Sequence, residues 1–127
     1  DLSKFDVTTN GVKHPKLGKG KAILQVVMGI CHTGGSPEDL TILHPRPWFS
    51  LGGDLDPSTF QDLAATHAAV GGPVFDPRRW FLKPDELIHH GGRTYAFTNQ
   101  WGVGTIEQIE SLIAQFPSAS IAVDKVG

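Results

Sequence analysis

Apolar residues recur at helical spacing in the first third of the chain. Residues 21–32 carry such a stripe, and Gly34 follows, where a helix can end in the left-handed conformation, so the pattern predicts a first helix. Residues 36–44 begin with serine, proline and two acidic residues, which is typical of a helix start. We expect a second, short helix there that ends before Pro45.

Two more helices are predicted further along the chain. Asp56 can cap a third helix that has apolar residues on one face and is followed by Gly71, a residue that commonly ends helices. Thr105 is expected to cap a fourth helix, with Gln108 at the capping-box position and Pro117 at its end. The buried stripe of this helix is expected to consist of Ile106, Ile109, Leu112, Ile113 and Phe116.

Strands are predicted from alternation and from turn residues. The clearest signal is a β-hairpin over residues 87–98, closed by Gly91 and Gly92, because a two-residue hairpin turn needs the positive φ angles that glycine adopts. Shorter strands are expected near residues 3–9, 48–51 and 121–123. The dipeptide Asn10-Gly11 predicts a turn directly after the first of these.

These elements predict an α+β domain with four helices and a small antiparallel sheet. A helix-turn-helix followed by a hairpin is also the outline of a winged-helix-like unit. We expect residues 1–20, which are rich in lysine and glycine, to form a basic arm or linker, and residues 21–127 to form the single domain. Because the chain opens on Asp1 and not on methionine, we also expect it to be part of a larger protein.

Charge and cysteine content narrow the functional classes. The net charge is −2, so the strongly basic footprint of many nucleic-acid-binding domains is absent overall, although five lysines lie among the first 21 residues. Cys31 is the only cysteine, which excludes an internal disulfide and favours a cytoplasmic location. No apolar run reaches the roughly 18 residues that a membrane helix needs, so no membrane partner is expected.

The segment from residue 92 to residue 102 gathers side chains that suit nucleic acid. Asn99 and Gln100 can bond to adenine, Arg93 can bond to guanine or phosphate, and Trp101 can stack on an exposed base. The alternative is that the aromatic residues belong to the core and that the two amides bond the backbone of the turn.

A second segment places paired arginines beside an aromatic residue. Arg78 and Arg79 precede Trp80, which suits phosphate contact supported by cation–π attraction. The alternative is that one arginine pairs with Asp76 or Asp85 and that Trp80 is buried. The lysine-rich arm from Lys13 to Lys21 could add salt-dependent contacts to a phosphate backbone.

Acid–base or metal chemistry would depend on His89 or His90 acting with Asp85 or Glu86. Successive residues of a strand point to opposite faces, so the two histidines do not readily share one metal ion. We predict neither a metal nor a cofactor. Cys31 lies late in an apolar helix and is expected to be a buried structural thiol.

At residues 76–81 and 92–102 the chain resembles a small domain of uncharacterised prokaryotic proteins, some of restriction or nuclease type. The resemblance runs from about Lys21 to Phe116. It implies a DNA-directed accessory role, and it carries over no catalytic residue.

The sequence therefore favours a non-catalytic module that binds nucleic acid, with DNA the first choice. The predicted contact residues are Arg78, Arg79, Arg93, Asn99, Gln100 and Trp101. One alternative is a protein-interaction domain whose anchors are Trp48, Trp80 and Trp101. The other alternative is a small hydrolase or nuclease built on the histidines and carboxylates named above.

Overall fold

The computed structural model describes residues 3–127, so Asp1 and Leu2 of the predicted arm lie outside the described residues. The chain divides into two compact units. Unit 1 comprises Asp1–Pro45 and Gln100–Gly127, and unit 2 is the intervening segment Arg46–Asn99. The α+β class with antiparallel sheets is confirmed, whereas the single domain expected from residue 21 onward is divided between these two units.

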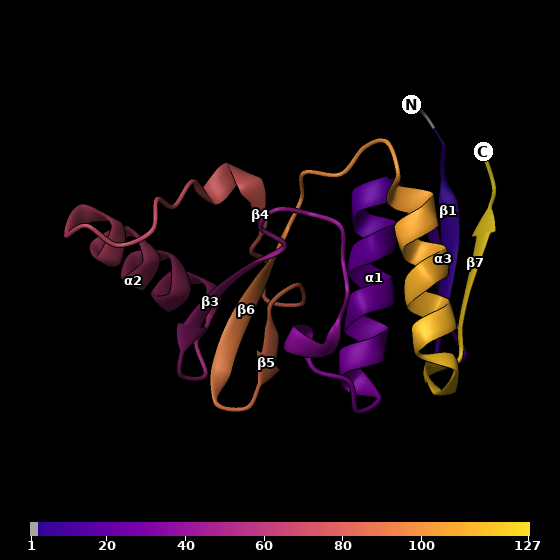
Figure 1. Ribbon diagram of the computed structural model, residues 1–127, viewed down its shortest axis with the longest axis horizontal. Helices are drawn as coiled ribbons and strands as arrows, with labels where there is room; N and C mark the ends of the chain where they lie inside the picture. Colours follow the sequence, from indigo (N-terminus) through magenta and orange to yellow (C-terminus); the bar gives the residue numbers. More distant parts are fainter. Residues whose placement is uncertain (1–2) are drawn as a thin grey trace. The chain divides into compact units, whose positions relative to one another are not determined.

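Unit 1 is a three-stranded antiparallel sheet with two helices on one face (Figure 1). Its strands, in the spatial order β2-β1-β7, are β1 (Phe5–Thr9), β2 (Val12–Leu17) and β7 (Ile121–Lys125). Its helices are α1 (Lys19–His32) and α3 (Thr105–Gln115). Two short 3-10 turns, η1 (Pro37–Asp39) and η3 (Pro117–Ala119), lie in the connections.

Residues 5–17, predicted as part of a mobile arm, form a β-hairpin. Asn10 and Gly11 have φ angles of 52° and 78°, which allows them to close the β1–β2 hairpin in the predicted tight turn. Phe5 and Val7 of β1 are buried, and β1 packs against α1. The hairpin is therefore held by an apolar contact with the first helix, a long-range interaction that the polar composition of this segment conceals.

Three α-helices form in the described residues, and not the four that were predicted. The segment expected to be a second helix contains only the single turn η1, and Leu40 after it is extended, with a ψ angle of 119°. Pro45 disfavours helical geometry at the residue before it, which leaves fewer than two turns for a helix to form. Ser36 precedes this turn as predicted, but its side chain makes no capping hydrogen bond.

The start of α3 also differs from the prediction. The residue before the helix is Gly104, in the left-handed conformation with a φ angle of 89°, and Thr105 is the first helical residue. The Thr105 hydroxyl donates to the Gly102 carbonyl at 2.6 Å and so stabilises the loop before the helix. Gln108 does not complete a capping box, because its side-chain oxygen accepts from the Leu43 backbone N–H at 2.9 Å.

Unit 2 is a four-stranded antiparallel sheet covered by one helix. Its elements are β3 (Trp48–Gly52), α2 (Pro57–Ala69), the 3-10 turn η2 (Pro77–Arg79), β4 (Trp80–Phe81), β5 (Ile88–His90) and β6 (Arg93–Thr98). β6 is central, with β3 on one side and both β4 and β5 on the other. The predicted hairpin over residues 87–98 is confirmed as β5 and β6, and both Gly91 and Gly92 have positive φ.

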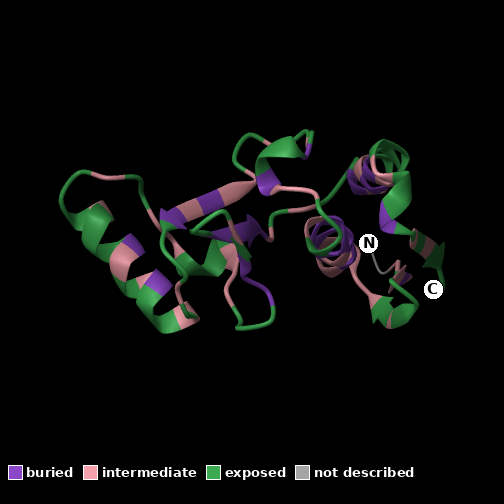
Figure 2. Cartoon of the chain, turned by 90° about the horizontal axis from the view of Figure 1, so that it is seen from below, coloured by how far each residue is buried: buried purple, intermediate pink, exposed green. Residues whose placement is uncertain are grey.

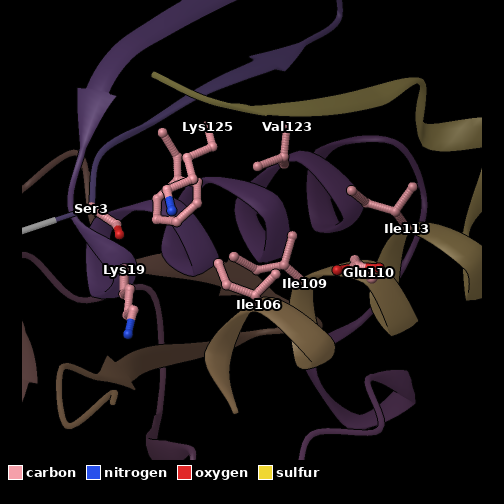
Figure 3. Close-up of a pocket in the computed structure, with 9 residues that line it drawn as sticks. Ser3, Lys19, Ile106, Ile109, Glu110, Ile113, Val123 and Lys125 are labelled. Atoms are coloured by element: carbon pink, nitrogen blue, oxygen red, sulfur yellow. The ribbon is translucent and has the colours of Figure 1, made fainter. Parts of the chain in front are cut away.

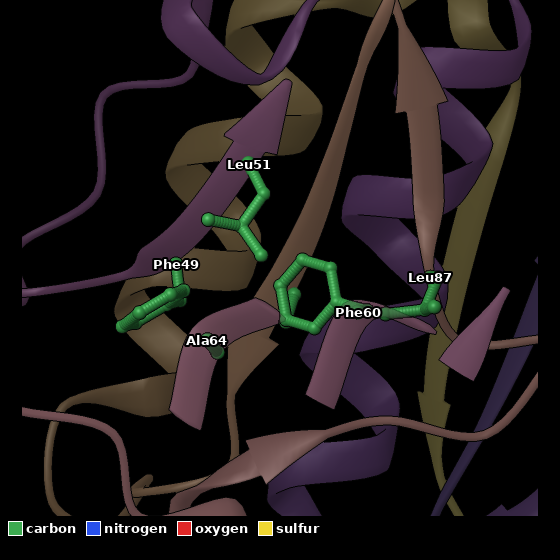
Figure 4. Packing of buried hydrophobic residues seen from close by; sticks show 6 residues of the cluster. Phe49, Leu51, Phe60, Ala64 and Leu87 are labelled. Atoms are coloured by element: carbon green, nitrogen blue, oxygen red, sulfur yellow. The ribbon is translucent and has the colours of Figure 1, made fainter. Parts of the chain in front are cut away.

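The core of unit 2 lies between α2 and the sheet. Phe60 and Ala64 of α2 are fully buried, and they pack with Phe49, Leu51 and Leu87 (Figure 4). Phe49 and Phe60 meet edge to face, with ring centroids 6.1 Å apart. The remaining positions of α2 are partly or largely exposed, so this helix covers the sheet with a narrow stripe (Figure 2).

Candidate nucleic-acid interface

Arg78 and Arg79 lie in η2 on the surface of unit 2, and both lie close to Asp76. The Asp76 carboxylate is 3.1 Å from the Arg78 Nε atom and 3.7 Å from the Arg79 Nε atom. The hydrogen bonds from the Arg78 side chain and backbone lower the pKa of Asp76, and the same contact raises the pKa of Arg78. Asp76 therefore offsets part of the positive charge of this predicted phosphate contact.

Asn99 holds η2 against the end of β6. Its side-chain amide donates to the Arg78 carbonyl at 3.0 Å, and its backbone N–H donates to the Arg79 carbonyl at 3.0 Å. The structure thus brings Asn99 together with Arg78 and Arg79, although the sequence analysis treated their two segments separately. In this arrangement Asn99 positions the turn that carries the two arginines, which corresponds to the backbone-bonding alternative for its amide.

Arg93 lies at the opposite end of β6 from Asn99. It flanks the glycine turn of the hairpin, and its Nε atom donates to the Ser50 hydroxyl of β3 at 2.9 Å. Six residues of strand separate the two ends of β6, which corresponds to roughly 20 Å. Arg93 is therefore not part of the cluster around Asp76.

Gln100 and Trp101 belong to unit 1 and lead into α3. The Trp101 ring packs on the His44 ring, with centroids 5.1 Å apart and an interplanar angle of 48°. Both residues line a hollow of about 250 Å³ together with Gly102, Val103 and Gly104. The six predicted contact residues are thus distributed over two units, and no single face within either unit carries them all.

A different set of basic residues gathers within unit 1. Phe5, at the start of β1, lies opposite Leu17 at the end of β2 and opposite Lys125 at the end of β7. α1 begins at Lys19, directly after β2. Five lysines consequently lie at this end of the sheet: Lys4, Lys16, Lys19, Lys21 and Lys125. We call these five residues the lysine end.

The lysine end coincides with the start of α1. Gly18, the residue before α1, provides no side-chain cap, and the first turn of the helix has no acidic residue. The Lys4 Nζ atom lies 3.8 Å from the position that a Cβ atom on Gly18 would occupy. The positive end of the helix dipole and a lysine ammonium group therefore act in the same region.

α3 begins at the same end of unit 1. Ile106, in the first turn of α3, lines a groove together with Ser3, Lys19 and Lys125 (Figure 3). Figure 1 shows the first turns of α1 and α3 at the end of unit 1 where β1 begins and β7 ends. Gln100 and Trp101 precede α3, and the hollow that they line shares no residue with this groove.

Acidic residues lie near the lysine end on both faces of the sheet: Glu110 lines the groove with Lys19 and Lys125, and Asp6 and Asp124 lie on the face to which Lys4 points. Asp6 and Asp124 alternate along their strands with Phe5 and Lys125, so their side chains point to the other face of the sheet. Asp6 also accepts a hydrogen bond from the Lys16 N–H at 2.9 Å and lies 3.8 Å from the Lys13 ammonium group. Glu107 is the one acidic residue in the first turn of α3.

Sequence reasoning missed Lys4 and Lys125 as members of a binding surface. The lysines from Lys13 to Lys21 were noted as possible phosphate contacts, but they were assigned to an arm. Lys125 lies more than 100 residues from them in an acidic segment. Only the antiparallel pairing of β1 with β7 brings it to Phe5, and no local signal predicts that pairing.

The histidine hypothesis finds different partners in the structure. His89 Nε2 lies 2.9 Å from the Leu55 carbonyl and 3.2 Å from the Asp54 carboxylate, and neither Asp85 nor Glu86 is among these contacts. Glu86 is buried, and its carboxylate accepts from the Lys83 backbone N–H at 3.1 Å. Among residues 3–127 no group of three or more histidine, cysteine or carboxylate side chains could hold a metal ion.

The three tryptophans proposed as protein-binding anchors are all half-buried. Trp48 packs against Tyr95 and Phe97, and Trp80 packs edge to face on Phe49 at 5.6 Å. Their rings therefore contribute to the packing of their own units.

No helix in the part of the chain that the structure describes is long and apolar enough to cross a membrane.

Cys31, at the end of α1, has the properties of a structural thiol. Burial, with a smaller effect from the carboxylates Glu38 and Asp39, raises its pKa to about 12. A thiol with so high a pKa is a poor nucleophile at neutral pH.

Comparison of the chain with models of protein families, with curated proteins and with solved structures gives no match.

Proposed function

We propose that this protein binds nucleic acid through the lysine end of unit 1. The observation that carries the proposal is the convergence of five lysines, from segments far apart in the sequence, at the end of the sheet where α1 and α3 begin. Lysine ammonium groups contact phosphates as point charges, and helix starts present backbone N–H groups to anions. A polyanion with regularly spaced phosphates suits such a surface better than a single small anion does.

In this proposal Trp101 and Gln100, which line a separate hollow of unit 1 before α3, contact the bases. Trp101 is half-buried against His44 and belongs to the segment that enters α3. Aromatic rings beside a positively charged surface are typical of proteins that bind single strands, because every base can stack on them. We therefore expect single-stranded nucleic acid to bind more tightly than duplex.

The arginines of unit 2 have a secondary role in this proposal. Arg78 and Arg79 share the negative charge of Asp76, and Arg93 stands alone beside the hairpin turn. A winged-helix mode, in which the β5–β6 hairpin contacts a duplex through Arg93, is the duplex-binding version of the proposal. It predicts that Arg93→Gln weakens binding to double-stranded DNA and leaves binding to single strands unchanged.

The test is a titration of labelled single- and double-stranded oligonucleotides over a range of salt concentrations. Each phosphate contact that is lost should reduce the slope of log K against log salt by about 0.7 for single strands. We expect Lys4→Gln and Lys19→Gln each to reduce the slope by about this amount and to weaken binding to all sequences alike. Lys83→Gln is the matched control, because it removes the same charge from unit 2.

Two results would overturn the proposal. One is the absence of binding at low salt to DNA and RNA in both single- and double-stranded form. The other is binding whose salt dependence is unchanged in the Lys4 and Lys19 variants but lowered by Arg79→Gln, which would place the phosphate contacts in unit 2.

A further inference from the structure

β7 forms an open edge of the sheet in unit 1. Among the described residues it pairs only with β1, through five consecutive residue pairs without a bulge. The other edge strand, β2, has Pro15, two exposed lysines and an irregular register. Proline, lysine and bulges at an edge block the addition of another strand. β2 is thus protected by proline, lysine and a bulge, whereas β7 has neither proline nor bulge and carries its charged residues, Asp124 and Lys125, at one end.

The backbone of β7 presents hydrogen-bonding groups to this open side. The Val126 N–H points to β1 and donates to the Lys4 carbonyl at 2.8 Å, while the Lys4 N–H donates to the Gly127 carbonyl at 3.2 Å. Residues that point their backbone groups to the paired strand alternate along an antiparallel ladder, so Asp124 and Ala122 also bond to β1. The N–H and C=O groups of Val123, between them, consequently point outward.

An apolar groove runs beside β7. It has a volume of about 410 Å³ and lies between β7 and α3 (Figure 3). Its apolar lining consists of Phe5, Ile106, Ile109, Ile113 and Val123. A strand added to β7 would direct alternate side chains into this groove, which is the arrangement by which open sheet edges bind extended segments.

Three charged residues, Lys19, Lys125 and Glu110, border the groove, and the two on its β7 and α3 sides carry opposite charges at different positions along it. Lys125 lies at the end of β7 beside Ile106, and Glu110 lies one helical turn further along α3. Both side chains are exposed, and neither has a hydrogen-bond or ion-pair partner among residues 3–127. An occupant with a lysine near Glu110 and an acidic group near Lys125 would therefore complement the groove.

We propose that the occupant is β7 of a second copy of this chain, paired antiparallel across a two-fold axis at Val123. This pairing places Lys125 of each copy opposite Ile121 of the other copy, on the groove side. There Lys125 of one copy can reach toward Glu110 of the other copy. The two-fold axis generates a second, equivalent contact. Val123 supplies both backbone hydrogen bonds at the centre, and the two sheets join into one of six strands.

Pairing of β7 with β7 of a second copy also avoids repulsion between the two Asp124 carboxylates. Asp124 of one copy lies opposite Ala122 of the other, so no two like charges face each other directly across the new ladder. The complementary charges and the open edge of β7 thus both favour a second copy of the chain as the occupant. The inference concerns β7 and α3 and does not depend on nucleic-acid binding.

The first experiment measures molar mass by sedimentation from micromolar to near-millimolar concentration. We expect a reversible monomer–dimer equilibrium. Lys125→Glu and Glu110→Lys should each weaken dimerisation about tenfold or more, because each brings two like charges together. The double variant Glu110→Lys/Lys125→Glu restores the opposite pairing and should recover the dimer. Exposed positions were chosen so that folding, monitored by circular dichroism, is retained.

The second experiment maps the axis with a disulfide in the Cys31→Ser background. Val123→Cys places two sulfur-bearing residues directly opposite, with Cα atoms about 5.5 Å apart, which is within the range of a disulfide. Mild oxidation should yield a covalent dimer. Asp124→Cys is the matched control, because it faces Ala122 of the second copy and the other side of the sheet.

The proposal is overturned if the protein remains monomeric over the whole concentration range. It is also overturned if dimers form but the double variant does not recover what the single variants lose, or if Asp124→Cys cross-links as fast as Val123→Cys. A monomer that binds extended peptides along β7 would show that the edge serves a different partner.

Discussion

Gly29 of α1 and Thr9 of β1 touch where the first helix packs on the sheet of unit 1. A Cβ atom on Gly29 would lie 2.8 Å from the Thr9 Cγ2 atom and 3.3 Å from the Ile121 Cδ1 atom. Side chains in close-packed interiors do not approach so closely. Glycine therefore sets the distance between α1 and the two strands β1 and β7, which carry part of the lysine end and the open edge.

This contact predicts a destabilised Gly29→Ala variant. Alanine favours a helix over glycine by about 1 kcal/mol, but overpacking a core costs about 1–3 kcal/mol, and at this contact distance we expect the cost to dominate. Thr9→Ser removes the Cγ2 atom and keeps the hydroxyl, so Gly29→Ala should cost less in that background. Urea unfolding of the four proteins in this cycle measures the coupling. Additive effects would show that the Thr9 methyl group is not the cause.

The sequence predicted local features better than long-range ones. The hairpin closed by Gly91 and Gly92, the capping of α2 by Asp56 and the apolar stripe of α1 were correct, since each depends on residues close together in the chain. The two-unit organisation was not predicted. Unit 1 is formed by the two ends of the chain, and the pairing of Phe5 with Lys125 leaves no periodic signal.

The candidate site was partly predictable for the same reason. The pairing of one arginine with Asp76, offered as an alternative, involves neighbouring residues and is present, whereas the hydrogen bonds from Asn99 to the Arg78 and Arg79 carbonyls were not predicted. Gln100 follows Asn99 in the sequence, yet it belongs to the other unit. Proximity in sequence was therefore a poor guide at the point where the chain passes from unit 2 to unit 1.

The helix cap at Asp56 predicts a pH-dependent contribution to stability. The carboxylate accepts from the Thr59 N–H at 2.7 Å, and the hydrogen bonds from Thr59 lower the pKa of Asp56 below its ordinary value of 3.8. A lowered pKa in the folded state stabilises the protein above pH 3.8, and this stabilisation is lost as the pH falls through the lower folded value. Asp56→Ala should therefore lower the melting temperature at neutral pH.

The difference in melting temperature between Asp56→Ala and the unchanged protein should shrink as the solution is acidified. Asp62→Ala, an exposed aspartate further along α2, is the control and should show a smaller effect at neutral pH. A difference that stays constant from neutral to strongly acidic pH would mean that the charged cap is not its source.

Cys31 should resist alkylation in the folded protein. Its pKa of about 12 lies three units above the ordinary 9.0, so at about pH 8 the thiolate fraction is roughly a thousandfold lower than in the unfolded chain. We expect iodoacetamide to modify the folded protein at least a hundredfold more slowly than the chain in guanidinium chloride. Glu38→Gln should accelerate modification slightly, because burial is the larger cause. Equal rates in the two states would contradict a protonated, half-buried thiol.

Trp101 should separate stacking on bases from attraction to phosphates. Removing an aromatic ring that stacks on a base costs about 1–3 kcal/mol of binding free energy, so Trp101→Ala should weaken binding to single strands by roughly tenfold to a hundredfold. The salt slope should not change, because no positive charge is removed. Trp101→Phe should recover most of the affinity, since it keeps an aromatic face and the packing on His44. Trp80→Phe in unit 2 is the control and should bind as the unchanged protein does. If Trp101→Ala lowers the salt slope together with the affinity, the loss comes from a displaced lysine end, and stacking by Trp101 has to be abandoned.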